Sequence, residues 1–294
     1  MNDTKKFWNL FKRHRDKELS AVGKEKEQSL QAQLGKLARN GIAFDFDKGK
    51  VLPRQSKFGG RPALPASWQW PRYTNEYGEE QLLPFLLQIN CEELAPCDTD
   101  NLLPHEGMFY LFYDLVNQPW LNGPGAQLLY TPTPAAELTP TEYPEGLPDA
   151  QRLHEMGLKF SNYPSVPDWN DYNSLLGGND NDNASNYTDW DIIEPQLESW
   201  GYPTVESDGR LLGYARLIQN GIAELCESRA RGDKPESYSP ESAREWILLL
   251  QLDSVDEPEI EVPFSDCGSL YFYIRQSDLK RRDFSHIQFE MQCY

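Results

Sequence analysis

The 294-residue sequence has no apolar run long enough to cross a membrane. A spanning helix needs about 20 apolar residues, whereas the longest uninterrupted candidate, Trp246–Leu250, has the length of a strand. The first ten residues contain lysines but no apolar core and no small-residue cleavage site, so they do not resemble a secretory signal. These absences predict a cytoplasmic protein without stable membrane association.

Cysteine and histidine are scarce, and the common catalytic motifs are absent. The five cysteines are scattered without CxxC spacing, which argues against a disulfide framework and a structural zinc site. The four histidines are far apart, and His154-Glu155 begins like a zinc-protease motif but lacks its second histidine. Neither GxSxG, GxGxxG nor a phosphate-binding GK[ST] loop occurs. The sequence therefore predicts no catalytic residue and no cofactor.

Positive charge is also scarce. The chain has 28 Lys and Arg against 46 Asp and Glu, a net charge of -18, and the segment 131–209 alone holds 15 acidic residues against Arg152 and Lys159. Such a surface repels nucleic acid and anionic lipid and attracts a basic partner protein or a cation. The alternative is that these acidic residues only keep the protein soluble.

Residues 1–24 have the opposite character, with seven Lys or Arg against three acidic residues and with aromatic residues between them. This pattern predicts a basic amphipathic extension. It would touch anionic lipid, cover an acidic groove of the same protein, or fray.

Short β-like runs dominate the rest of the chain. Leucines at helical spacing predict a helix over 24–40 that Gly41 ends, and a strand is expected over 42–52. Further helices are expected over 211–231 and 240–244. Further strands are expected over 84–89, 107–113, 126–130, 157–160, 246–252, 269–274 and 287–292. Many short strands with few helices predict an α+β fold with a mostly antiparallel sheet.

The chain also resembles itself. Leu86–Asn90 precedes the aromatic run Gly107–Asp114, as Leu249–Asp253 precedes Gly268–Ile274, and a glycine turn comes before each pair. This order predicts two internally repeated strand units, around 58–114 and 212–274, joined by the acidic segment 131–209. Chance similarity is the less economical explanation, because order and spacing both match.

Each unit carries one glutamine in an apolar strand, Gln88 or Gln251. An unpaired buried amide costs about 1–3 kcal/mol, so each must find partners. Either nearby backbone satisfies each glutamine, or the two meet in a polar pocket between the units, near Asp253 and Tyr271.

The segment Lys57–Pro65 (KFGGRPALP), Trp70-Pro71 after it, the two glutamine strands, Leu212–Gln219 and Asp278–Phe284 together resemble the YwqG-like family, a bacterial domain of unknown function. The resemblance spans residues 25–294, which it implies form one compact α+β domain; Ala215 replaces the proline usual in that family. It implies no established catalytic residue. Some relatives are thought to accompany toxin and immunity systems, which favours an interaction role.

Aromatic residues cluster after the first glycine turn beside Arg61, where they form either a core lid or an interface anchor. The binding candidates are Arg61, Trp68, Trp70, Gln88, Tyr214, Gln251, Asp253 and Tyr271. Asp180, Asp182 and Asp191 have the spacing of a calcium loop, but Ser185 replaces its glycine and the flanks are not helical, so a solvated loop without metal is expected.

These features predict a non-enzymatic interaction or binding module, immunity-like or regulatory toward a basic partner. The alternative is an enzyme or small-molecule sensor with its pocket at the interface of the two repeats.

Overall fold

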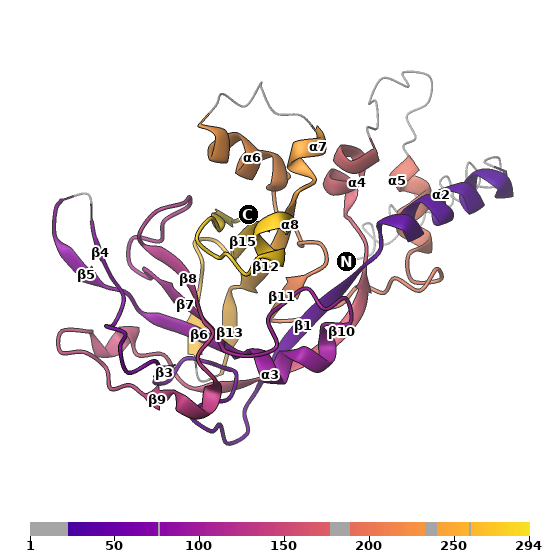
Figure 1. Cartoon of the computed structure of the whole chain (residues 1–294). Helices are drawn as coiled ribbons and strands as arrows, with labels where there is room; N and C mark the ends of the chain where they lie inside the picture. The colour runs from indigo at the N-terminus through magenta and orange to yellow at the C-terminus, as the bar shows by residue number, and fades with distance from the viewer. Residues whose placement is uncertain (1–22, 76, 177–188, 233–239, 259) are drawn as a thin grey trace, which may run out of the picture.

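The computed structural model describes residues 23–294 except 76, 177–188, 233–239 and 259 (Figure 1). The predicted extension 1–24 therefore falls almost wholly outside the described residues. So do two of the three calcium candidates, Asp180 and Asp182. Within the described part of the chain, no helix combines the length and the apolar character that a membrane crossing requires.

One large antiparallel sheet organises the molecule. Its ten strands follow the order β16-β15-β12-β11-β1-β10-β2-β6-β7-β8, and every pairing is antiparallel. In chain order they are β1 (Arg39–Asp47), β2 (Lys57–Phe58), β6 (Phe85–Asn90), β7 (Met108–Tyr113), β8 (Ala126–Thr131), β10 (Met156–Ser165), β11 (Gly209–Leu212), β12 (Trp246–Asp253), β15 (Ser269–Arg275) and β16 (Gln288–Gln292). The expected α+β class with a mostly antiparallel sheet is confirmed.

The sheet curls so that its two edges meet. Leu121, shortly before β8, forms a bridge with Glu290 of β16, and the Met291 amide donates to the Trp120 carbonyl at 2.8 Å. The curled sheet encloses the main apolar core, to which β6, β7, β12 and β15 contribute alternate residues. Because one strand face fills this core, the opposite face needs separate cover.

Smaller apolar clusters provide that cover. One lies against β6 and β7 and includes Trp70 and Tyr110, and a second joins α6 (Ala223–Arg231) to β12 and β15. A third packs α2 (Lys24–Leu37) against α4 (Trp169–Leu176) and α5 (Asp189–Ile193). Figure 1 shows α6 and α7 (Pro240–Ala243) beyond one end of β12 and β15, and α2, α4 and α5 together at one side.

The helices are mostly short. They are α2 (Lys24–Leu37), α3 (Cys91–Leu94), α4 (Trp169–Leu176), α5 (Asp189–Ile193), α6 (Ala223–Arg231), α7 (Pro240–Ala243) and α8 (Gln276–Lys280). The described residues also form three two-stranded sheets: β3 (Ala63–Leu64) with β9 (Thr139–Pro140), β4 (Arg72–Thr74) with β5 (Glu80–Leu82), and β13 (Val255–Glu257) with β14 (Ile260–Val262).

Two predicted helices are too long. The helix expected over 24–40 ends at Leu37, because the following residues already pair in β1. The helix expected over 211–231 is wrong in its first half. Its start belongs to β11. Leu212 at the end of β11 and Gly213 after it both adopt positive φ and turn the chain, so α6 begins only at Ala223. The segment 131–209 is more than a connection, since β10 within it pairs with β1 in the middle of the sheet.

Candidate functional site

The turn after β11 places Tyr214 between two hollows of the protein. Leu212 and Gly213 have φ of 55° and 61°, a conformation that favours glycine. A Cβ on Gly213 would lie 2.7 Å from the Ser165 side chain, so no larger residue fits. The turn brings the Tyr214 amide to the Ser165 hydroxyl, to which it donates at 2.9 Å.

Tyr214 is fixed at its other end as well. Its hydroxyl donates to the Leu37 carbonyl at 2.8 Å, and the Arg39 guanidinium lies over its ring, 4.5 Å from the centroid. Burial raises the pKa of Tyr214 to about 12, against a smaller lowering by Arg39. The ring is therefore a rigid, neutral wall with a cation on it.

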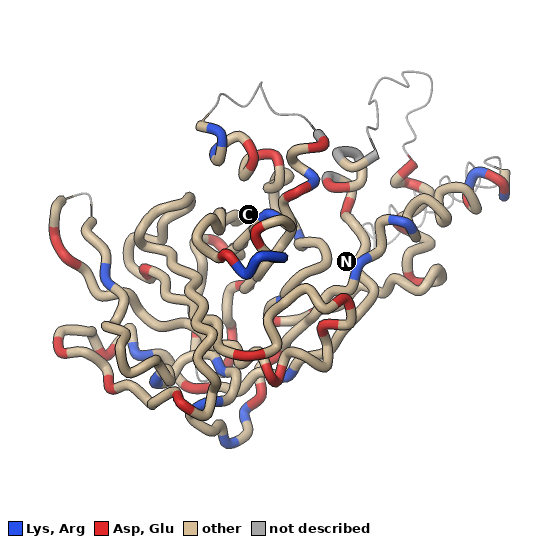
Figure 2. Tube along the Cα trace, viewed as in Figure 1, with Lys and Arg blue, Asp and Glu red and all other residues tan. Residues whose placement is uncertain are grey.

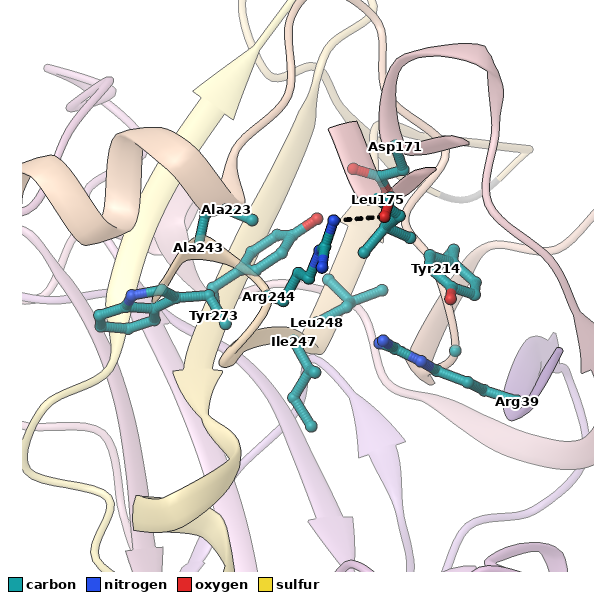
Figure 3. Close-up of a pocket in the computed structure, with 12 residues that line it drawn as sticks. Arg39, Asp171, Leu175, Tyr214, Ala223, Ala243, Arg244, Ile247, Leu248 and Tyr273 are labelled. Carbon is teal, nitrogen blue, oxygen red and sulfur yellow. Dashed lines mark hydrogen bonds between the residues drawn. The ribbon is translucent and has the colours of Figure 1, made fainter. Parts of the chain in front are cut away.

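We call the first hollow the Arg244 cavity. It is lined by apolar side chains and by Arg39, Asp171, Tyr214, Arg244 and Tyr273. Its volume is about 30 Å³, which is room for about two water molecules. In Figure 3, Arg39 and Tyr214 lie to one side of it, with Arg244 and Tyr273 to the other. The Arg244 guanidinium donates to the Leu175 carbonyl at 2.5 Å. This cavity has a mixed polar and apolar lining and is too small for a substrate.

Asp171 is the carboxyl group of the Arg244 cavity. Burial raises the pKa of Asp171 to about 7; Asp168 and Glu224 raise it further, and Arg39 opposes them. Its side chain still reaches solvent in part. Asp171 thus changes charge near neutral pH, and Tyr273, whose pKa burial and this carboxyl both raise, stays protonated.

We call the second hollow the Arg210 cleft. It measures about 270 Å³ and lies between the end of β10, the segment 202–205 and the residues after β11. Its walls include Tyr163, Pro167, Trp190, Tyr202 and Tyr214. Arg210, Arg216 and Asp168 also line it, and aromatic walls with a few charged groups are the usual composition of a small-ligand site.

Arg210 is only 4% exposed, yet it forms no salt bridge with any described carboxylate. Its Nη2 contacts the Val205 carbonyl and the Ser207 hydroxyl, both at 3.3 Å, and its Nη1 contacts the Tyr163 hydroxyl at 3.4 Å, all long for hydrogen bonds. Its Nε has no partner within the described structure. A buried charge without a counter-ion is costly by several kcal/mol. Buried charges in proteins are usually paired, so an unpaired buried cation indicates a candidate binding site.

The two glutamines singled out by sequence are both buried, and the structure keeps them apart. Four strands separate β6, which carries Gln88, from β12, which carries Gln251. Gln88 accepts from the Ala63 amide at 2.9 Å and donates to the carbonyls of Pro53 and Gln55. Nearby groups satisfy it, so the shared pocket in which the two amides would meet does not form.

Gln251 has an equivalent set of contacts in its own part of the sheet. It accepts from the Arg216 amide at 2.9 Å and donates to Asp253 at 2.7 Å, which also accepts from the Ser269 hydroxyl. The Tyr271 hydroxyl donates to the Arg216 carbonyl at 2.6 Å, as Tyr110 donates to Ala63. These candidates hold the segment after Tyr214 in place and lie behind the Arg210 cleft rather than in it.

The aromatic cluster after the first glycine turn is mainly core. Trp70 is buried and donates its indole N–H to the Leu83 carbonyl at 2.8 Å, while Trp68 packs on Tyr110 with ring centroids 5.7 Å apart. Arg61 is exposed and pairs with Glu142. Only Tyr77, on the β4–β5 turn, projects well into solvent.

One group of described residues has the atoms for a cation. Carboxylate oxygens of Asp278 and Asp283 and the His286 Nδ1 lie within 4.8 Å of one another. Asp278 is already paired with Arg281, which accounts for its charge. Of the calcium candidates, only Asp191 is described, in α5.

Sequence reasoning missed Arg39, Asp171, Arg210 and Arg244. A signal existed for one of them, because Arg210 stands three residues before Gly213 as Lys57 stands three before Gly60. The others come from segments far apart in the chain, and only the fold brings them to Tyr214.

The comparisons with known proteins give a family but no function. A family model described as a domain of unknown function (DUF1963) matches residues 56–293. None of the curated proteins compared with the chain matches it.

Proposed function

Since the chain belongs to the DUF1963 family, a domain of unknown function, we propose that it is a non-enzymatic binding module whose ligand lies beside Tyr214. The observation that carries this proposal is the buried Arg210, which lines the Arg210 cleft without a carboxylate partner among the described residues. A ligand that enters this cleft gains a preformed cation and rigid aromatic walls. Pre-organised groups of this kind bind without a large ordering cost.

The charges around Tyr214 support the same proposal. Arg39 and Arg244 also form no salt bridge with a described carboxylate, so three arginines surround one tyrosine in a chain of net charge -18. Figure 2 shows Asp and Glu distributed over many elements of the fold. Against that background, three arginines beside the two carboxyl groups Asp168 and Asp171 are a local excess of positive charge.

The alternative is an enzyme that uses Asp171. A carboxyl whose pKa is about 7 suits proton transfer at neutral pH. The volume of the Arg244 cavity, about 30 Å³, opposes this alternative because it admits water and little else. Among the described residues, the wider Arg210 cleft is lined by Asp168 and several hydroxyl groups but by no histidine, cysteine or lysine.

A basic partner protein remains the proposal for the acidic segment 131–209. Its support is the imbalance of 15 acidic against two basic residues, and we expect such a partner to bind in a salt-dependent manner. A lysine-rich peptide is the probe. Calorimetry at low salt should detect binding that 0.5 M salt removes, and no heat at low salt would reject this second function.

We also make proposals about the origin, the family, the location and the excluded partners of the protein. We propose that the two strand units arose by duplication, on the basis of the matching contacts of Gln88 and Gln251. From the motifs we also propose that the protein is YwqG-like and bacterial. From the charge we propose that it is cytoplasmic and binds neither nucleic acid nor membranes. An immunity-like or regulatory role is our expectation for such a protein.

A screen with fragments of all charges tests the binding proposal. Saturation-transfer NMR with acidic, neutral and basic fragments should give hits that Thr204→Trp removes, because Thr204 is exposed and lines the Arg210 cleft. Thr99→Trp, at an exposed residue outside the cleft, is the control and should keep the hits. Hits that survive Thr204→Trp, or no hits of any charge, would reject the proposal.

A further inference from the structure

Lys57 and Arg210 occupy equivalent positions in two parts of the sheet. Lys57 of β2 pairs with Gln88, and Arg210 of β11 pairs with Gln251. Each basic residue is followed by a turn with two consecutive positive φ angles, at Gly59-Gly60 and at Leu212-Gly213. Both basic side chains are buried, with 1% and 4% of their surface exposed.

The strand on the other side extends the equivalence. Gly157 of β10 pairs with Lys57, and Ala43 of β1 pairs with Arg210. Two residues toward the N-terminus from these partners lie Glu155 and Gly41, respectively. The position that holds a carboxylate in one part of the sheet is therefore a glycine in the other. The Tyr163 ring packs against Gly41, and the Tyr163 hydroxyl lies 3.4 Å from the Arg210 Nη1.

The consequence is a difference in charge balance. The Glu155 carboxylate lies 2.6 Å from the Lys57 Nζ and neutralises it. Arg210 has no such partner among the described residues, and the space beside it is the Arg210 cleft. The comparison with Glu155 thus shows that Arg210 lacks a carboxylate beside it.

We infer that the Arg210 cleft binds a small molecule with a carboxylate and a flat apolar group, the carboxylate beside Arg210 taking the part that Glu155 plays beside Lys57. This inference rests on the proposed binding function and names its ligand class. The planar guanidinium suits a carboxylate. The flat group would stack among Tyr163, Trp190 and Tyr202.

A monoanion fits this cleft better than a phosphate does. Asp168 also lines the cleft, and the whole chain carries -18 charges, so each further negative charge on the ligand meets repulsion. A single carboxylate balances the single charge of Arg210. An aromatic monocarboxylate is therefore the ligand class that the geometry favours over inorganic phosphate or a phosphate ester.

The test compares 3-phenylpropionate, its neutral amide 3-phenylpropanamide, and inorganic phosphate by calorimetry on the full chain. We expect the carboxylate to bind at least tenfold more tightly than either of the others. Arg210→Met should weaken carboxylate binding at least tenfold, whereas Arg72→Met, which removes an exposed arginine of the β4–β5 hairpin, should leave it unchanged. Thr204→Trp blocks the cleft with Arg210 still in place and should also abolish binding.

Several results would overturn the inference. Equal binding of the amide, tighter binding of phosphate, unchanged binding by Arg210→Met, or no binding of the carboxylate would each do so. The fragment screen separates this failure from that of the binding function. If fragments without a carboxylate occupy the cleft, the inferred ligand class is wrong but the binding function is supported. If no fragment binds, both the ligand class and the binding function are rejected.

Discussion

Lys57 and Arg210 each lie opposite a buried glutamine in the same curled sheet, yet only Lys57 has a carboxylate beside it. The Glu155 carboxylate completes a structural ion pair at Lys57. At Arg210 the equivalent position is Gly41, against which the Tyr163 ring packs, so Arg210 meets a phenol and the Arg210 cleft instead of a carboxylate. One position thus serves stability and the other, by our proposal, serves binding.

The two basic residues should therefore respond differently to loss of charge. Lys57→Met leaves Glu155 unpaired and should lower the free energy of unfolding by about 1–2 kcal/mol. Arg210→Met removes an uncompensated buried cation and should leave stability unchanged or raise it by about 1 kcal/mol. Urea unfolding of both variants measures the difference, and a larger loss for Arg210→Met would show that Arg210 is structural.

The two glutamines should also differ in their effect on stability. Gln88→Leu leaves the Ala63 amide and two carbonyls unpaired in a buried region and should cost about 2–3 kcal/mol. Gln251→Leu should cost less, since the exposed Arg216 lets water reach the groups it leaves. Chemical denaturation checks this order, and equal losses would mean that water does not reach the second site.

Gly213 should tolerate no side chain. Gly232, which ends α6 at φ 66°, has nothing within 4 Å of an added Cβ, so Gly232→Ala tests the backbone cost alone, about 1 kcal/mol. Gly213→Ala adds the collision with Ser165 and should cost at least twice as much. Melting temperatures of the two variants test this, and similar losses would contradict the tight approach of the turn to β10.

Asp171 should make stability depend on pH. Because its folded-state pKa is raised to about 7 from 3.8, the folded protein favours the neutral carboxyl, and stability falls as pH rises from about 4 through 7. Asp171→Asn should match the wild type near pH 4 and exceed it above pH 7. One pKa unit corresponds to about 1.4 kcal/mol, and partial exposure reduces the gain to about 1–2 kcal/mol.

Melting curves at pH 4, 6 and 8 measure this gain. Asp266→Asn, at an exposed aspartate, controls for the loss of one charge. A gain that is already complete at pH 4, or a loss at pH 8, would contradict the raised pKa of Asp171.

Much of the sheet follows from local sequence. The runs around Gln88 and Gln251 are short and almost entirely apolar, and both form strands close to their predicted bounds. The helix expected from Leu211 fails because its apolar residues also suit a strand, and because two left-handed residues turn the chain before α6. Tertiary pairing with β1 decides between these states.

The candidate site was less accessible to such reasoning. Tyr214 was named from its glycine turn, but Arg39 and Asp171 reach it from β1 and α4, and Arg244 from the end of α7. No local sequence pattern predicts that these residues lie near Tyr214. Whether a buried cation has a partner is likewise a property of the fold, since Glu155 lies 98 residues from Lys57 in the chain.

The most direct test of ligand binding in the Arg210 cleft is an NMR titration that follows the indole N–H signals. Trp190 lines the cleft, whereas the Trp70 indole is bonded to Leu83 in a separate apolar cluster. With 3-phenylpropionate, the Trp190 signal should shift and saturate while the Trp70 signal stays in place, and Arg210→Met should abolish the shift. A Trp190 signal that does not move, or that moves equally in Arg210→Met, would contradict the account.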